Sequence, residues 1–302
     1  MSTAEIGGIR SRFGKWMQDS SNRAKVLLVP LLVFELVFFI APALILLRFS
    51  LLQPTGQQAY VSGTWSLDAY NTILNSSVIH KVLFFTVEMS VYATVLTLLL
   101  SILLSYAIWR TDGIVKVVLL LSVLLPLFTT LVVKIYAMAI ILAPVGLVNS
   151  LLLDIGVLNS PIRIINNKWG VLLGQIYITM PYATLAIYSV LPTIEWNTVE
   201  AARDLGASRP RSVIEVVLPQ ALPGIVVGTV IIWTWSMGAY TAPALLGSGS
   251  EWTVALEIQN VMLTQFNWPV GAALAIVLLV IILISILLIT GMLNRLGGDV
   301  DV

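Results

Sequence analysis

Residues 192–224 read PTIEWNTVEAARDLGASRPRSVIEVVLPQALPG, a mostly polar segment between two apolar runs. Asn197 is a suitable N-cap, because Glu200 three residues later can complete a capping box. A short helix over residues 199–205 is expected to follow. Gly206 comes next, and glycine is the residue that most often takes the left-handed conformation at the end of a helix. The first half of the segment therefore predicts a short helix with a sharp stop.

A second helix is expected after this stop. Ser208 can cap it, and Pro210 is tolerated in its first turn. The helix should end near Leu218-Pro219, because proline disfavours a helical conformation in the residue before it. Together the two helices predict a helix–turn–helix over residues 194–220, which is called the elbow below.

The rest of the chain is strongly apolar. The 302 residues are 58% hydrophobic and only 10% charged, whereas soluble domains carry roughly 25% charge. Six segments reach the length of about 20 apolar residues that a membrane span needs. They are residues 26–47, 82–109, 115–142, 169–191, 222–245 and 271–293. The sequence therefore predicts an all-α membrane protein with six transmembrane helices.

Lysine and arginine indicate how these spans are oriented, because they concentrate on the cytoplasmic side. With the N-terminus inside, the inner segments hold Arg10, Arg12, Lys15, Arg23, Lys25, Arg110, Lys116, Arg203, Arg209, Arg211 and Arg295. The outer segments hold only Arg48, Lys81, Arg163 and Lys168. Both ends of the chain and the elbow are therefore expected in the cytoplasm.

The expected organisation follows from these segments. A basic cytoplasmic tail covers residues 1–25, the six-helix domain covers residues 26–293 and includes the elbow, and a short cytoplasmic tail covers residues 294–302. The first apolar run is about as long as a full span, so we interpret it as a retained helix and not as a cleavable signal.

Several classes of function are excluded or disfavoured. The chain has no cysteine, which excludes disulfides, zinc–thiolate sites and cysteine nucleophiles, and His80 alone makes no multi-histidine site. No GxxxxGK[ST] loop is present, so ATP is expected to bind elsewhere. We therefore expect no enzyme, with no catalytic, cofactor-binding or metal-binding residue. The net charge of +1 gives no field that would attract nucleic acid.

The first helix of the elbow has the features of a docking surface. Small alanines allow a partner to approach closely, and a charged rim can fix the register of docking. The residues concerned are Ala201, Ala202 and Leu205, with Glu200, Arg203 and Asp204 as the rim. The alternative is an amphipathic helix that rests on lipid headgroups.

One pattern in the elbow resembles a known family. Glu200-Ala201-Ala202, then Gly206, then Leu218-Pro219 and Pro223-Gly224, is similar to the EAA loop of ABC importer permeases. The resemblance implies the type I ABC importer permease fold, in which this loop is the coupling helix seated on a separate ATPase. The coupling residues that it implies are Glu200, Ala201, Ala202, Arg203, Asp204, Gly206, Leu218 and Pro219.

Longer stretches resemble the spermidine/putrescine subfamily of these permeases. They are LPLFTTLVVKIYAMAIIL (125–142), VGLVNSLL (145–152), GQIYITMPYATLAIYSVLPTI (174–194), WSMGAYTAPALLG (235–247) and FNWPVGAALAIVLL (266–279). The chain departs from the subfamily at Lys134, where arginine is usual, and at Glu88, where an apolar or small residue is expected.

The resemblance also implies partners, a location and a solute class. The partners are a homologous second permease, two ATP-binding subunits that use ATP and Mg, and an external solute-binding protein. The location is the bacterial cytoplasmic membrane. The solute is a small organic molecule, with polyamines first and opines or amino-acid derivatives as alternatives. A secondary transporter or channel without an ATPase is the main rival function.

Two charged residues inside spans are candidates for the solute path, because charges at membrane depth are costly. Glu88 and Lys134 are both expected roughly 10 Å below the outer surface. Equal depth makes a structural ion pair feasible, and the alternative is that one or both face the path. Glu35 in the first span has no evident partner within the chain.

Aromatic residues complete the candidate path. Aromatic faces can hold ammonium groups by cation–π attraction. The candidates are Tyr136 in the third span and Trp233, Trp235 and Tyr240 in the fifth. The alternative is that they serve as packing residues or interface anchors.

Overall fold

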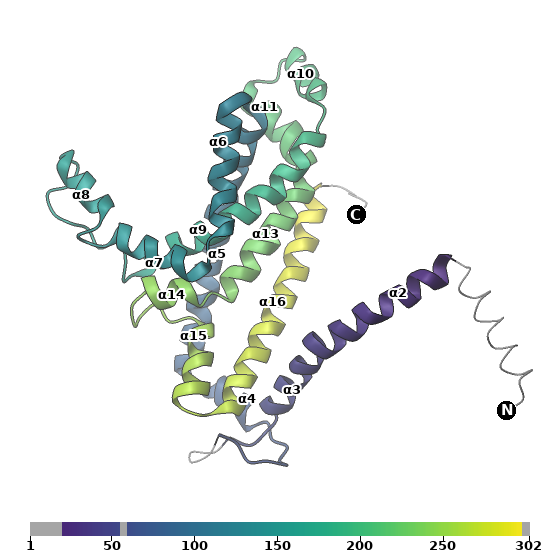
Figure 1. The fold of residues 1–302 in the computed structure, drawn as a ribbon, viewed down its shortest axis with the longest axis vertical. Helices are drawn as coiled ribbons and strands as arrows, with labels where there is room; N and C mark the ends of the chain where they lie inside the picture. Colours follow the sequence, from purple (N-terminus) through teal and green to yellow (C-terminus); the bar gives the residue numbers. More distant parts are fainter. Residues whose placement is uncertain (1–19, 55–58, 298–302) are drawn as a thin grey trace, which may run out of the picture.

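The computed structural model describes residues 20–54 and 59–297 (Figure 1). In chain order its helices are α2 (Ser20–Glu35), the π-helix η1 (Leu36–Ile40), α3 (Ala41–Ser50), α4 (Asp68–Asn75), α5 (Ser77–Arg110), α6 (Gly113–Leu124), the 3-10 helix η2 (Leu125–Phe128), α7 (Leu131–Leu142) and α8 (Leu147–Asp154). They continue with α9 (Lys168–Val190), η3 (Leu191–Thr193), α10 (Trp196–Asp204), α11 (Arg209–Ser212), the π-helix η4 (Val213–Val217), α12 (Leu218–Gln220), α13 (Leu222–Met237), α14 (Thr241–Leu246), α15 (Val254–Gln259), η5 (Asn260–Thr264) and α16 (Trp268–Gly297).

The centre of the molecule is a bundle of α5, α9 and α13, with α16 against α13. A stripe of small polar residues runs along the buried face of α5: Thr86, Ser90, Thr94, Thr97, Ser101 and Ser105. Small residues let helix backbones approach closely in a membrane, and their hydroxyls can bond across the contact. Ser101 donates to the Met180 carbonyl at 3.4 Å, and the Thr179 hydroxyl lies 3.5 Å from that of Thr97. This stripe therefore joins α5 closely to α9.

Gly224, which lies directly after the elbow, allows α13 to pack closely against α9. A Cβ at this position would lie 2.7 Å from the Ala186 carbonyl oxygen and 3.0 Å from the Ile187 Cα. Both atoms belong to the backbone of α9, so they cannot turn aside as a side chain can. The absence of a side chain at Gly224 is thus a packing requirement.

Gly224→Ala is expected to lower the free energy of unfolding by about 1–3 kcal/mol, because the added methyl group overpacks the contact with α9. Thermal unfolding of the purified subunit in detergent measures the change. Gly291→Ala on α16 is the matched control, because a Cβ there meets no atom within 4 Å. Equal unfolding temperatures for the two variants would show that the α13–α9 contact is looser than it looks.

The number of membrane-length helices agrees with the sequence, although their limits differ. The described residues contain five helices long and apolar enough to span a membrane, and a sixth if a bent pair counts as one span. The five are Leu28–Ser50, Ser77–Arg110, Leu131–Asp154, Lys168–Thr193 and Trp268–Leu293. The bent pair is Arg209–Gln220 with Leu222–Met237, at an angle of 74°.

The third predicted span, residues 115–142, is wrong as a single helix. Pro126 lies in the 3-10 helix η2, and Thr129 and Thr130 then take extended conformations before α7 begins. Proline removes a backbone donor and so weakens a continuous helix at this point. In Figure 1 α6 runs along the bundle, whereas α7 and α8 leave it sideways.

The fifth predicted span is too long by eight residues. Helix α13 ends at Met237, with Gly238 as its C-cap, and the chain then turns into the separate helix α14. Glycine readily ends a helix, because it loses the most conformational freedom within one. The space beside this break forms part of a cavity described below.

The first span diverges from the bundle. Helix α3 packs on α16, whereas α2 points away from the other helices in Figure 1. All side chains over residues 28–40 are exposed, Glu35 among them. Lipid or another membrane chain would cover such a surface. Helix α2 is already present at Ser20, the first described residue, ahead of the predicted residue 26. Arg10, Arg12 and Lys15 lie outside the described residues.

The elbow and α4 lie at opposite ends of the bundle (Figure 1). The predicted orientation requires this separation, because the elbow is expected inside and residues 48–81 outside. Which end faces the cytoplasm stays a prediction.

Candidate coupling surface and solute path

The predicted helix–turn–helix is present at residues 194–220. Helix α10 is followed by Gly206, whose φ is +98°. An L-residue with a side chain is strained at such an angle, so this position favours glycine. The chain then runs through α11, η4 and α12 and bends by 74° into α13. The elbow is therefore a sharp reversal that leads directly into a span.

The predicted capping box is wrong. Helix α10 begins at Trp196, Glu195 occupies the N-cap without a side-chain bond, and Asn197 lies within the first turn. Packing fixes this start: the Trp196 ring lies edge-to-face on Trp109 at 5.5 Å, and the Arg110 guanidinium lies 3.5 Å from the Trp196 ring centroid. Aromatic and cation–π contacts here outweigh a favourable cap.

The second helix ends at Gln220, one residue beyond the predicted Leu218-Pro219. The reason given for the end is wrong, because Leu218 before the proline is itself helical. The preceding turn, Val213–Val217, is a π-helix. Pro219 then stands in the first turn of α12, where its missing N–H is tolerated. Ser208 is at the predicted N-cap, but its side chain makes no capping bond.

A hydrophobic cluster joins the elbow to the bundle. Val199 of α10 and Val217 of η4 are each 1% exposed. They pack with residues of α9, η3 and the start of α13, namely Ile187, Leu191, Ile194, Ala221 and Ile225. Leu218 is half-buried against the same cluster. The elbow is therefore packed through one continuous hydrophobic cluster against α9 and the start of α13.

The outer face of the elbow carries the other predicted coupling residues. Leu205 is 91% exposed, although leucine is strongly apolar. Glu200, Ala201, Asp204 and Pro219 are exposed around the same loop, and Ala202 and Arg203 are half-buried. The elbow thus presents Leu205 within a charged rim, and Ile214 of η4 is a second exposed apolar side chain, at 60%.

Glu88 and Lys134 do not form the ion pair that equal depth allows. In the described ranges, the ion pair within 4.0 Å is Arg211–Glu215 on the elbow. The break at Thr129–Thr130 takes Lys134 out of a continuous third span, so the depth argument fails. Lys134 is 5% exposed on α7 and makes no side-chain hydrogen bond with a described residue.

A cavity of about 600 Å³ lies beside the start of α5 and holds Glu88. Lys81, Trp252 and Glu257 also line it. Glu257 is 8% exposed and accepts a hydrogen bond from the Trp252 indole at 2.7 Å. Two carboxylates against one lysine leave an excess of negative charge, which together with the aromatic ring suits a cationic guest. Sequence reasoning missed Glu257, although a carboxylate within an apolar segment was a usable signal.

The loop beside this cavity is held by Glu251. Its carboxylate accepts a hydrogen bond from the Ser248 amide at 2.9 Å and others from the Ser248 and Ser250 hydroxyls. Partial burial raises the pKa of Glu251, but these hydrogen bonds outweigh it and bring the pKa below its usual value. The loop thus carries a stable negative charge at neutral pH.

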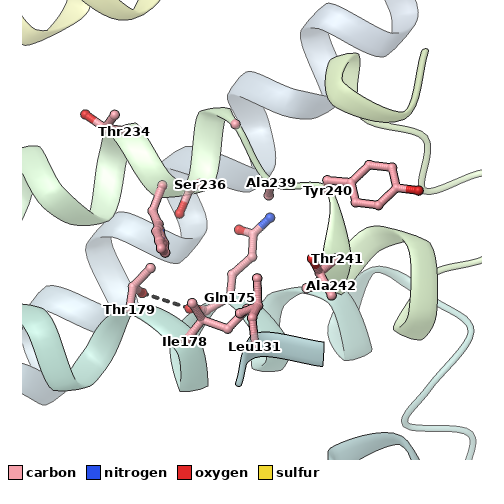
Figure 2. Close-up of a pocket in the computed structure, with 12 residues that line it drawn as sticks. Leu131, Gln175, Ile178, Thr179, Thr234, Ser236, Ala239, Tyr240, Thr241 and Ala242 are labelled. Atoms are coloured by element: carbon pink, nitrogen blue, oxygen red, sulfur yellow. Dashed lines mark hydrogen bonds between the residues drawn. The ribbon is translucent and has the colours of Figure 1, made fainter. Parts of the chain in front are cut away.

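A second cavity, of about 400 Å³, lies where α13 breaks, between α9 and the start of α14 (Figure 2). Trp235 and Tyr240 both line it, so two of the predicted path residues come together here. Gln175 reaches into its centre from α9, and Thr179 follows one turn later. The sequence analysis predicted neither Gln175 nor Thr179 as a path residue. A single polar residue in an apolar helix does not show whether its side chain faces a cavity.

The remaining predicted path residues lie elsewhere. Trp233 is 8% exposed and donates its indole N–H to the Ser285 hydroxyl at 2.6 Å, which fits a packing role between α13 and α16. Tyr136 is exposed on α7. Neither residue lines the two cavities described above.

This arrangement is that of a transport protein. Its apolar helices are long enough to cross a membrane, two cavities with a few polar or charged lining residues lie among them, and the elbow projects from the end of the bundle. Residues 97–296 match the family described as "Binding-protein-dependent transport system inner membrane component", and the chain belongs to this family. It is therefore an inner-membrane component of a transport system and spans the membrane several times.

Individual relatives agree with this assignment. The chain is 30% identical to the spermidine/putrescine transport system permease protein PotB of Haemophilus influenzae over 271 residues, which are 89% of this chain and 94% of the relative. It is 29% identical to PotB of Escherichia coli, over 84% of this chain and 92% of the relative. The sulfate transport system permease protein CysT of Escherichia coli is 28% identical over 43% of this chain and 48% of that protein.

Solved structures share the fold. A bacterial ABC transporter that imports the acidic polysaccharide alginate matches with a TM-score of 0.72 and 18% identity, over 95% of this chain and 100% of that one. The alginate transporter in complex with its pentasaccharide-bound periplasmic protein matches with a TM-score of 0.73 and 20% identity, over 91% and 95% of the two chains. The predicted ABC importer permease fold is thus confirmed.

Proposed function

We propose that this chain forms half of the membrane path of an ATP-driven importer for a polyamine such as spermidine or putrescine. Its partners in this proposal are a homologous second permease, two ATP-binding subunits that use ATP and Mg, and an external solute-binding protein. The elbow docks on an ATP-binding subunit through Leu205 and the residues around it.

One observation supports this role most directly: α13 connects the elbow to the cavity at its other end. The helix begins at Leu222, directly after Ala221 of the hydrophobic cluster that joins the elbow to the bundle. It ends at Met237, and its C-cap Gly238 lines the cavity that contains Gln175. Its 16 residues span about 24 Å, at roughly 1.5 Å per residue. Movement of the elbow by an ATPase would therefore change the shape of the cavity.

The polyamine assignment draws on the named relatives and on the charge of the cavity beside the start of α5. Glu88 and Glu257 line one cavity together with Trp252 and outnumber Lys81, the one cationic residue of its lining, so the excess negative charge and the aromatic ring favour an ammonium group over a carboxylate. The buried Lys134 favours a second candidate solute, an amino-acid derivative whose carboxylate would pair with the lysine.

Uptake by the complete transporter in proteoliposomes tests the proposal. Proteoliposomes that contain the four subunits, supplied with the loaded binding protein, should take up labelled spermidine only when ATP is present on the side of the membrane where the ATP-binding subunits lie. Uptake that continues after the ATP-binding subunits are left out would instead identify a secondary transporter or channel. Uptake of a carboxylated amine and not of spermidine would favour the second candidate.

A further inference from the structure

The cavity at the break of α13 contains buried polar groups that the protein leaves unpaired. Gln175 is 2% exposed, and neither its amide nitrogen nor its amide oxygen has a hydrogen-bond partner among the described residues. Ser236 is 1% exposed, and its hydroxyl oxygen is also unpartnered. Leaving such groups unsatisfied costs about 1–3 kcal/mol each, so their presence needs an explanation.

These groups face the same space. Figure 2 shows Gln175 extending from α9 with its amide directed toward Ser236 and Ala239. Thr179 does not satisfy the amide, because its hydroxyl donates to the Gln175 backbone carbonyl at 2.8 Å. The ring of Tyr240 points away from Gln175, and its hydroxyl donates to Gln259 at 2.9 Å. The amide and the Ser236 hydroxyl are therefore left without a hydrogen-bond partner among the described residues.

The surroundings favour a cation. The cavity lies at the C-terminal end of α13, where Thr234, Trp235, Ser236 and Gly238 line it. The C-terminal end of a helix carries a partial negative charge, and broken membrane helices use this end to hold cations. Trp235 adds an aromatic ring that is 40% exposed.

No residue that lines this cavity carries a full charge at neutral pH. Lys134 follows Leu131 by three residues on α7, but only Leu131 lines the cavity. A neutral site of oxygen atoms and an aromatic ring would hold a cation weakly. Weak binding suits a transport path, because a solute must leave each site as readily as it enters.

We propose that Gln175 and Ser236 form an intramembrane subsite for one ammonium group of the transported solute. The Gln175 amide oxygen and the Ser236 hydroxyl accept hydrogen bonds from the ammonium group, and the end of α13 and Trp235 stabilise its charge. This inference rests on the proposed function, because it takes the solute to be a polyamine that passes through this chain.

Spermidine uptake by the complete reconstituted transporter tests the subsite, together with ATP hydrolysis stimulated by the loaded binding protein. Gln175→Met removes the amide at similar length, and Ser236→Ala removes the hydroxyl. We expect uptake per ATP hydrolysed to fall by about tenfold for Gln175→Met and severalfold for Ser236→Ala, as the loss of one hydrogen bond to a charged group predicts. Hydrolysis itself should change little, because the elbow is intact.

Thr184→Val is the matched control. Thr184 lies on the same helix as Gln175, is 0% exposed and has an unpartnered hydroxyl, but it does not line the cavity. Uptake by this variant should equal that of the wild type. An equal loss of uptake in Thr184→Val and Ser236→Ala would show a general packing effect and would overturn the subsite.

Gln175→Glu provides a second readout that does not depend on loss of function. A carboxylate in the cavity should raise the amount of labelled spermidine that the transporter retains in nanodiscs without binding protein, and should slow uptake. Unchanged retention by Gln175→Glu, or wild-type uptake by Gln175→Met, would overturn the subsite while leaving the proposed function standing. Absence of spermidine uptake by the wild type would refute both.

Discussion

Gly206→Asp is expected to reduce solute uptake by at least about tenfold while ATP hydrolysis continues. Gly206 has a φ of +98°, where an L-residue is strained by about 1–2 kcal/mol. A Cβ there meets no atom within 4 Å, so the substitution acts through the backbone and not through a clash. The chain would relieve the strain by changing the angle between α10 and α11. Because this turn shapes the docking surface, coupling to the ATPase should fail while membrane insertion is retained.

Uptake and hydrolysis measured on the same proteoliposomes separate coupling from folding. Gly156→Asp is the matched control, because Gly156 also has a positive φ, of +73°, with open space around it, and lies in the turn after α8. It introduces comparable strain away from the elbow and should leave coupling intact. Normal uptake by Gly206→Asp would count heavily against the coupling role of the elbow.

Leu205→Glu is expected to weaken binding of the ATP-binding subunit by about a hundredfold. Burial of a leucine side chain is worth about 1.5–3 kcal/mol, and an unpaired carboxylate at the centre of an interface adds a further penalty. Leu205 is 91% exposed in the isolated chain, so the substitution should leave the fold unchanged. Co-purification shows whether the ATP-binding subunit still binds. The affinity of the detergent-solubilised permease for that subunit, measured for the wild type and for Leu205→Glu, then gives the size of the change.

Leu67→Glu is the control for Leu205→Glu. Leu67 is 67% exposed beside α4, at the opposite end of the bundle. It should leave ATPase binding unchanged. If Leu205→Glu binds the ATPase as tightly as the wild type does, the alternative in which α10 rests on lipid headgroups is favoured.

The membrane-length helices and the local backbone conformation at Gly206 could be predicted from the sequence. Long apolar runs identified the membrane helices, because few other structures bury so many consecutive apolar residues. Gly206 could be placed correctly, since its conformation depends on the residue itself. The two helices of the elbow were recognisable because Gly206 marks the turn that separates them.

Features that depend on tertiary packing could not be predicted in the same way. The start of α10 is fixed by Trp109 and Arg110, which lie far away in the sequence, so a favourable cap at Asn197 was misleading. The break at Thr129–Thr130 lies between apolar runs that look continuous, and its omission produced the incorrect Glu88–Lys134 pair. Gln175 became a candidate only when its amide was found to face a cavity.

A single cysteine at position 205 gives the most direct test of the coupling role of the elbow, because the chain has no native cysteine. In the active, assembled transporter, Leu205→Cys should cross-link to the ATP-binding subunit and should resist a membrane-impermeant maleimide added outside intact cells. Leu67→Cys should show the opposite behaviour. Labelling of position 205 from outside, or no cross-link to the ATPase in a transporter that still imports solute, would contradict the account.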